Sequence, residues 1–158
     1  RIQQSQRDLV AAGARAVIRL MPDCDDQALL SPGLLDISGL ENIKDEEIFG
    51  PLLQFTRVNS FEQAIKKAND TKYGLSAGLF SDDRGCYDLF AKKIRAGVVN
   101  WNRQTTGASG KLPFGGCGHS GNHRPSGYFA ADYCSYPVAS LESDAIELPQ
   151  TLLNGFSH

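Results

Sequence analysis

The stretch GVVNWNRQTTGASGKLPFGGCGHSGNHRPSGYFAADYCSYPVASL, residues 97–141, decides how the rest of the sequence is interpreted. It opens with a β-prone apolar run at residues 98–101 and passes into a loop of small polar residues. The loop turns at Pro113-Phe114-Gly115-Gly116, and a second β-prone run follows at residues 136–141. Loops this long inside a compact domain tend to be either binding loops or disordered. The aromatic residues and the proline-anchored turn favour an ordered binding loop.

The residues upstream of this loop predict helices separated by short strands. Apolar residues recur on one helical face from residue 2 onward, so the first helix is expected to end near Gly13. Ser60, with Gln63 three residues later, forms a capping box that predicts the start of a second helix. Asp82-Asp83 predicts the start of a third helix, which should end near residue 95. The β-prone runs between them predict strands at residues 16–20, 34–40, 53–58, 75–80 and 98–101.

The order of these elements predicts an α/β fold. Strands and helices alternate across residues 53–101, which is the rhythm of right-handed βαβ units that build a parallel sheet. Gly97 occupies the place where a left-handed glycine ends a helix. At 158 residues the chain can bury one core of ordinary size. We therefore expect one folded body in residues 1–135, followed by a β-prone run and a polar tail in residues 136–158.

Composition excludes several classes of partner. The chain is 41% hydrophobic and 22% charged, which is typical of soluble globular proteins. Its net charge of −2 and scattered Lys and Arg residues argue against binding nucleic acid or an anionic membrane. No apolar run is long enough for a membrane span, and no signal peptide opens the chain. The widely spaced cysteines, with no CxxC pair, fit thiols of a cytoplasmic protein: Cys24, Cys86, Cys117 and Cys134.

Three motifs in order carry a resemblance to a known family. EIFGP at residues 47–51, YGLSAGLF at residues 73–80, and VNWN with PFGG and SGNHRPS farther along resemble the C-terminal part of the aldehyde dehydrogenase superfamily. Within it, the chain is most similar to the N-succinylglutamate 5-semialdehyde dehydrogenases of arginine catabolism. The resemblance extends from Arg1 to about Ser143. It implies the C-terminal half of an NAD(P)-dependent catalytic domain, with residues 137–141 as an inter-subunit β-strand of a homo-oligomer.

The resemblance implies a cofactor role for three residues. Glu47 would accept hydrogen bonds from the nicotinamide ribose, Phe49 would pack beside the nicotinamide, and Leu75 would line the same pocket. A carboxylate accepts from a diol, and an aromatic face orients a flat ring. Gly50-Pro51 would turn the chain so that both side chains reach a cleft. The alternative is a surface Glu47, a core Phe49 and a Leu75 buried in a strand.

The resemblance also implies a substrate site in the long loop. Phe114 would form part of the substrate tunnel wall, and Thr106 and Ser109 would anchor the substrate. Hydroxyls and glycine N–H groups in such a loop suit a carboxylate, with Arg103 or Arg124 available for bidentate pairing. A small-molecule semialdehyde that carries carboxylates is the expected substrate. The alternative is a Gly/Ser-rich surface loop that binds nothing.

No catalytic residue is expected within these 158 residues. In the family the nucleophilic cysteine follows a Gly-Gln pair, and no cysteine of this sequence does so. GCGHSG at residues 116–121 matches the GxGxxG fingerprint, but no strand directly before it and no βαβ unit after it support dinucleotide binding. The chain begins at Arg1 inside an expected helix, which favours a piece of a longer protein whose N-terminal part is a partner of this one.

Two other functions are weighed against a dehydrogenase fragment. The run at residues 136–141 would suit an interaction module that pairs its edge strand with another subunit. Cys117, His119, His123 and Cys134 would be the ligands of a small zinc protein, but their spacing matches no common zinc motif, so no metal is expected. The choice between NAD and NADP stays open, with NAD expected.

Overall fold

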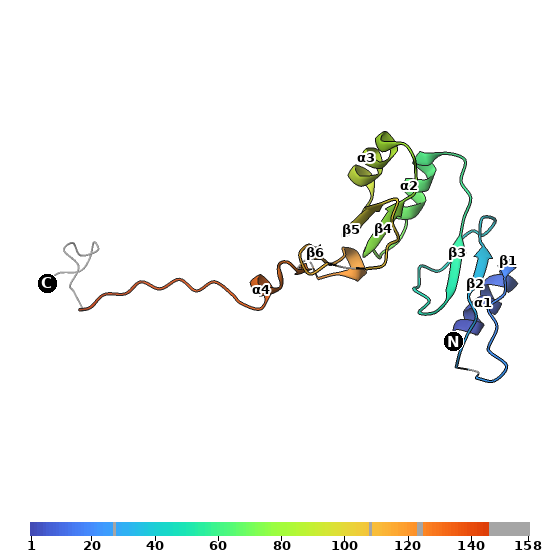
Figure 1. Ribbon diagram of the computed structural model, residues 1–158, viewed down its shortest axis with the longest axis horizontal. Helices are drawn as coiled ribbons and strands as arrows, with labels where there is room; N and C mark the ends of the chain where they lie inside the picture. Colours follow the sequence, from blue (N-terminus) through green and yellow to red (C-terminus); the bar gives the residue numbers. More distant parts are fainter. Residues whose placement is uncertain (27, 108, 123–124, 146–158) are drawn as a thin grey trace, which may run out of the picture.

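The computed structural model describes residues 1–26, 28–107, 109–122 and 125–145 (Figure 1). A first group of elements comprises α1 (Ile2–Ala11), β1 (Arg15–Ile18), β2 (Gly33–Asp36) and β3 (Leu52–Phe55). A second group comprises α2 (Phe61–Asn69), β4 (Ser76–Leu79), α3 (Arg84–Lys93) and β5 (Val98–Trp101). The remaining short elements are β6 (Pro113–Phe114), η1 (Gly118–Ser120), β7 (Ser126–Gly127) and α4 (Ala130–Tyr133).

The first group is a three-stranded sheet covered by α1. β1 pairs antiparallel with β2, and β2 pairs parallel with β3. Leu20, Leu35 and Leu52 form its buried core, and apolar residues of α1 pack against them. The buried Gln6 side chain donates to the Leu20 carbonyl at 3.0 Å and accepts from the Leu20 N–H at 2.7 Å. This paired contact ties α1 to the segment after β1.

An ionic cluster around Asp36 joins β1, β2 and the segment after β3. The Asp36 carboxylate accepts from the Ser38 hydroxyl at 2.6 Å and the Ser38 N–H at 3.1 Å, and it pairs with Arg15 at 3.1 Å. Arg57 lies 3.7 Å away. The hydrogen bonds from Ser38, followed by that from Arg15, lower the pKa of Asp36 from 3.8 to about 2.

We expect this cluster to stabilise the fold in a pH-dependent way. Because the pKa of Asp36 is lower in the folded state, its contribution is complete above about pH 4 and is lost as pH falls towards 2. Thermal unfolding of the chain between pH 6 and pH 2 should therefore show a smaller loss of Tm for Asp36→Asn than for the unchanged chain. Asp82→Asn, which removes an exposed carboxylate, serves as the control. Parallel Tm profiles for all three proteins would contradict the assignment.

Both predicted helix starts in the second group are confirmed. Ser60 caps α2, because its hydroxyl accepts from the Gln63 N–H at 3.2 Å. The Gln63 side chain returns a bond to the Asn59 N–H at 3.0 Å, one residue before the cap. Asp83 caps α3 by accepting from the Gly85 N–H at 2.7 Å. The first helix also ends before Gly13 as predicted, and Gly13 has a φ of 112°.

The α/β class with parallel strand pairing is confirmed, and the described strands lie in separate sheets. β4 and β5 pair in parallel around α3, as a βαβ unit requires. β3, however, pairs with β2 and not with β4, so the strands divide into separate sheets. Residues 136–141 form no strand; they extend away from the rest of the chain, as Figure 1 shows. Pairing with another subunit stays a prediction, because a strand needs a partner and one chain alone does not supply it.

Gly97 does not end a helix in the left-handed conformation, which corrects the prediction. α3 ends at Lys93, and its cap residue Ile94 is extended, with φ −74° and ψ 138°. Gly97 is not among the glycines with positive φ. It is needed for a different reason, since a Cβ at this position would overlap the carbonyl oxygen of Gly115. Gly97 therefore allows the PFGG turn to lie directly against the start of β5.

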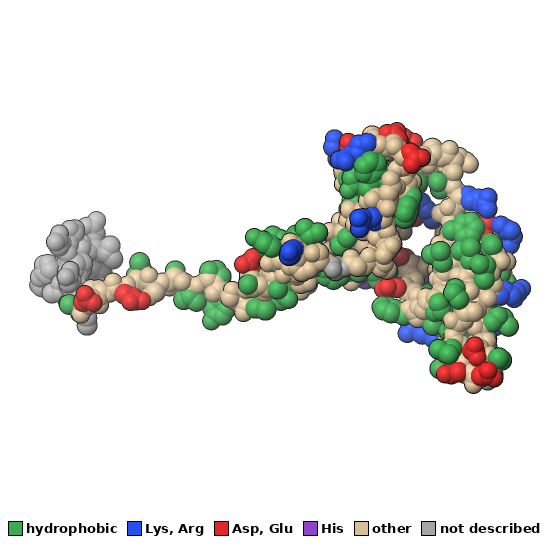
Figure 2. Space-filling model, viewed as in Figure 1, with side chains coloured by type: hydrophobic (Ala, Val, Ile, Leu, Met, Phe, Trp, Pro, Cys, Tyr) green, Lys and Arg blue, Asp and Glu red, His purple; other side chains and the backbone are tan. Residues whose placement is uncertain are grey.

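Much of the apolar surface is uncovered. Outside the first core, Ile65 of α2 and Phe90 of α3 are buried at 5% exposure. Figure 2 shows apolar side chains spread over the visible face and along residues near the C-terminal end. Large apolar surfaces of this kind mark places where other protein segments bind. No helix in the described part of the chain has the length and apolar character needed to cross a membrane.

Candidate functional site

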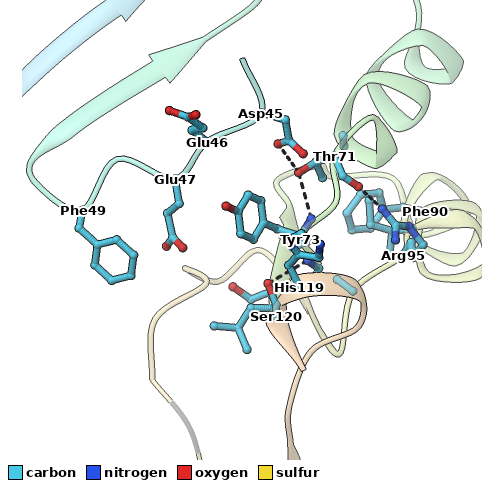
Figure 3. Close-up of a pocket in the computed structure, with 18 residues that line it drawn as sticks. Asp45, Glu46, Glu47, Phe49, Thr71, Tyr73, Phe90, Arg95, His119 and Ser120 are labelled. Atoms are coloured by element: carbon cyan, nitrogen blue, oxygen red, sulfur yellow. Dashed lines mark hydrogen bonds between the residues drawn. The ribbon is translucent and has the colours of Figure 1, made fainter. Parts of the chain in front are cut away.

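A cleft of about 810 Å³ brings together the three residues expected to hold the cofactor. Its walls come from the segment at residues 45–49, from the residues that lead into β4, and from the turn at His119 and Ser120. Glu47, Phe49 and Leu75 all line this first cleft. Figure 3 shows the Glu47 carboxylate and the Phe49 ring projecting from the same segment.

The exposure of two of these side chains differs from the alternative interpretation. Phe49 is 82% exposed, so it is not a core residue. Leu75 is 41% exposed and lies just before β4, so it is not a buried strand residue. Glu47 is exposed and has no hydrogen-bond or ion-pair partner among the described residues. One cleft is therefore lined by the Phe49 ring, the Leu75 side chain and the Glu47 carboxylate, which has no partner among the described residues.

The opposite wall is built by the loop that follows PFGG. The Gly74 N–H donates to the Ser120 hydroxyl at 3.1 Å, and the Cys117 N–H donates to the Gly74 carbonyl at 3.0 Å. The His119 N–H donates to the Lys72 carbonyl at 2.8 Å. A Cβ at Gly74 would overlap the Cys117 sulfur at 2.5 Å, so this junction requires glycine. The loop is thereby fixed against the start of β4.

This loop also contains the residues of the GxGxxG match, GCGHSG at residues 116–121. Gly118–Ser120 form a single turn of 3-10 helix, and no α-helix begins there. The local structure agrees with the sequence argument against this fingerprint, because these residues do not form the α-helix N-terminus that would bind the phosphates. His119 and Ser120 lie within the GCGHSG match, but nothing in the sequence analysis placed them at the first cleft. Tyr73 and His119, which are distant in sequence, meet edge to face there with ring centroids 5.9 Å apart.

A second cleft of about 690 Å³ brings together the three residues expected to bind substrate. Thr106, Ser109 and Phe114 all line it, and so does Arg103. Phe114 belongs to β6, is 37% exposed, and pairs with Ser126 of β7. Phe114 thus projects from a short strand pair, whereas Thr106 and Ser109 belong to the connecting loop.

The loop of the second cleft is bent by two residues with positive φ. Asn102 has a φ of 51°, and its side chain accepts from the Ser81 N–H at 2.9 Å and donates to the Ser81 carbonyl at 3.0 Å. Gly107 has a φ of 92°. The Arg103 side chain, which follows the Asn102 bend, has no hydrogen-bond or ion-pair partner among the described residues. Arg124, the other cation considered for this site, lies outside the described residues.

Cys86 and Cys117 are held by contacts within the described part of the chain. The Cys86 thiol donates to the Asp83 carboxylate at 3.3 Å, and this contact, followed by burial, raises the pKa of Cys86. A raised pKa keeps the thiol protonated and weakly nucleophilic. The Cys117 sulfur lies 3.5 Å from the Arg95 carbonyl and 3.7 Å from the Gly74 carbonyl, where it packs between backbone groups.

The ligands weighed for zinc do not form a cluster among the residues that the structure describes. Cys117, His119 and Cys134 do not meet there, and His123 lies outside the described residues. Potential ligand atoms do gather at Asp23, Cys24 and Asp25, which are all exposed. Asp23 uses its carboxylate to accept from the Asp25 N–H at 2.9 Å, as in an ordinary turn.

Comparison with known proteins gives consistent matches. A sequence model described as the aldehyde dehydrogenase family matches residues 1–137. The fold is similar to that of P. syringae AldA, an indole-3-acetaldehyde dehydrogenase solved with NAD+ (33% identity, TM-score 0.72, 83% of this chain and 27% of that one). It is also similar to aldehyde dehydrogenase 21 from Physcomitrella patens, solved with the reaction product succinate (27% identity, TM-score 0.72, 83% and 27%). A third match is betaine aldehyde dehydrogenase from Staphylococcus aureus, solved with NAD+ (27% identity, TM-score 0.71, 84% and 27%).

Proposed function

Because this chain belongs to the aldehyde dehydrogenase family, we propose that it forms the part of an NAD-dependent aldehyde dehydrogenase that holds the nicotinamide ribose and walls the substrate tunnel. The chain spans 27% of the length of the three solved structures it resembles, so the activity belongs to a longer protein. One observation carries the proposal: Glu47 and Phe49 share a cleft with Leu75, which lies on a different element.

The residues of the first cleft fit a nicotinamide riboside. Glu47 offers a carboxylate without a partner among the described residues, which suits the two hydroxyls of a ribose. Phe49 offers an exposed ring face, and Leu75 adds an apolar contact for a flat heterocycle. Two of the three related structures are complexes with NAD+, which supports NAD as the cofactor, whereas NADP stays open. When bound, NAD accepts hydride from the substrate.

The chain's own residues bind and orient the reactants. Glu47 accepts from the ribose hydroxyls and limits rotation of the cofactor, while Phe114 closes one side of the tunnel that the aldehyde enters. Positioning of this kind lowers the barrier because the reacting atoms are already aligned. The family's nucleophilic thiolate follows a Gly-Gln pair that this sequence lacks. We therefore assign the covalent step to another part of the natural protein, and we expect these 158 residues alone to form no NADH from any aldehyde.

The second cleft supports N-succinylglutamate 5-semialdehyde as the substrate. Arg103, Thr106 and Ser109 offer a guanidinium and two hydroxyls in one place, which suits the carboxylates of this molecule. The Physcomitrella relative was solved with succinate, a dicarboxylate, as its product. Both observations favour a substrate with carboxylates over an uncharged aldehyde.

Replacing Arg103 tests the substrate assignment. In the natural protein, Arg103→Met should raise the KM for N-succinylglutamate 5-semialdehyde about tenfold, because a charge-assisted hydrogen bond to the substrate is lost. The KM for propanal, which has no carboxylate, should change less than about twofold, since no such bond is lost. Steady-state NADH formation with both aldehydes measures the two values. A natural protein that oxidises propanal but not the semialdehyde would contradict the substrate, and one that oxidises no aldehyde would contradict the function.

The proposal also covers the self-association of the protein and its location in the cell. We assign residues 136–141 to contacts with another copy of the protein, in the cytoplasm; most of the tail that follows lies outside the described residues. Tyr136 at 82% exposure and Val138 at 76% have no cover within the described chain. The same residues favour a second candidate function, an oligomerisation module without catalysis. Sedimentation of the natural protein tests both assignments together, because a monomer at every concentration would contradict each of them.

A further inference from the structure

We propose that Asp45 is a positioning residue that holds Glu47 and Phe49 at the first cleft. The inference rests on the proposed function, because it assigns a role in cofactor binding to a residue outside the EIFGP motif. Asp45 lies two positions before Glu47 in an acidic run, and none of the three family motifs includes it.

Asp45 joins two of the segments that form the walls of the first cleft, through both of its carboxylate oxygens. One oxygen accepts from the Thr71 hydroxyl at 2.7 Å, and the other accepts from the Lys72 N–H at 2.6 Å. Figure 3 shows Asp45 beside Thr71, with Tyr73, two residues farther along the chain, nearby. The Thr71 hydroxyl also accepts from the Tyr73 N–H at 3.2 Å. These contacts link the segment that carries Glu47 and Phe49 directly to the turn that leads to Leu75.

No other hydrogen bond in the described part of the chain performs this task. The two bonds of Asp45 are the only ones that join residues 41–49 to the rest of that part. Ile48 packs against the first core, but apolar packing alone does not fix direction as two hydrogen bonds do. In the chain, Glu47 lies between Asp45 and Ile48. Its direction at the cleft therefore depends on the two hydrogen bonds that the Asp45 carboxylate accepts.

The ionisation of Asp45 agrees with this geometry. The Lys72 N–H, followed by the Thr71 hydroxyl, lowers the pKa of Asp45 from 3.8, with a smaller contribution from the positive charge of Lys72. A lowered pKa keeps the carboxylate ionised at neutral pH, so both oxygens remain acceptors. The contact is accordingly complete at neutral pH.

Three variants separate the contact from the charge. Asp45→Ala removes both hydrogen bonds. Asp45→Asn can form two hydrogen bonds in the same place. The amide oxygen can accept from the Lys72 N–H, and the amide NH₂ can donate to the Thr71 hydroxyl, which reverses the direction of that bond. Glu41→Ala is the matched control, since it removes an exposed carboxylate of the same segment that lines neither cleft.

The first measurement is hydrogen exchange of the Lys72 amide in the natural protein. We expect Asp45→Ala to lose the protection of this amide, whereas Asp45→Asn and Glu41→Ala keep it. Unchanged protection in Asp45→Ala would overturn the contact itself. This result does not depend on any enzymatic activity.

The second measurement is the KM for NAD+ and for the aldehyde. Asp45→Ala should raise the KM for NAD+ roughly fivefold to tenfold, because the segment occupies its binding position for a smaller fraction of the time. The KM for the aldehyde should stay within about twofold, and Asp45→Asn should restore most of the affinity for NAD+. An equal KM for NAD+ in Asp45→Ala and the unchanged protein, or an equal rise for both substrates, would overturn the positioning role. An unchanged protein that shows no NAD+-dependent oxidation would instead overturn the proposed function.

Discussion

Glu47→Gln in the natural protein is expected to raise the KM for NAD+ and to lower kcat/KM for NAD+ by about 10- to 100-fold. Glutamine has the same length, but its NH₂ group cannot accept from a hydroxyl and its oxygen carries no charge. Two charge-assisted hydrogen bonds to the ribose are therefore replaced by weaker, neutral ones, of which the amide oxygen can accept but the NH₂ group can only donate. Glu47 has no partner within the described chain that the substitution would disturb, so the fold should be retained.

The measurement for Glu47 combines direct NAD+ binding with steady-state kinetics. Glu41→Gln makes the same chemical change in the same segment, away from both clefts, and should leave NAD+ binding within about twofold. Equal affinity for NAD+ in Glu47→Gln and Glu41→Gln would contradict the assignment of the first cleft to the ribose.

Gly97→Ala is expected to destabilise the chain by about 3 kcal/mol, or roughly 6–12 °C in Tm. The added Cβ would overlap the Gly115 carbonyl oxygen, which is backbone and cannot rotate away. Gly97 also donates to the Gly74 carbonyl at 3.1 Å, and Gly74 contacts Ser120 at the first cleft. Displacing the PFGG turn should therefore affect both clefts, because Phe114 lines one and Ser120 lines the other.

A matched glycine provides the control for this prediction. A Cβ at Gly39 would meet no atom within 4 Å, and Gly39 has no positive φ, so Gly39→Ala should change stability by less than about 1 kcal/mol. In the natural protein, Gly97→Ala should also lower kcat/KM for NAD+ and for the aldehyde together. Thermal midpoints that fall equally little for the two alanine variants would show that the turn can move without loss.

The helix starts could be predicted because capping is local. Ser60 and Gln63 lie within one turn, and Asp83 accepts from a backbone N–H only two residues away. The same local logic failed at Gly97. A glycine after a helix is often left-handed, but this one is needed for the approach of Gly115, which is distant in sequence. The run at residues 136–141 has the composition of a strand and forms none, because strand formation depends on a partner.

The candidate site could be predicted in part for a different reason. The motifs that resemble the aldehyde dehydrogenase family identify Glu47, Phe49 and Leu75 together, and the structure places them at one cleft. Asp45 could not be identified in this way, and Ser120, although it opens the SGNHRPS motif, could not be placed against Gly74. The contact between Asp45 and Lys72 spans 27 positions, and that between Ser120 and Gly74 spans 46. No periodicity or capping rule links residues at such separations.

The amino-acid sequence was enough to determine the alternation of helices and strands and the helix caps, because each depends on side chains near one another in the chain. It also determined the family, because the family motifs occur in a set order. The partners of β3, the reason for Gly97 and the residues that share each cleft were decided only when the chain folded. These features depend on contacts between distant segments, whose free energy comes from packing and hydrogen bonding in three dimensions and leaves no local pattern in the sequence.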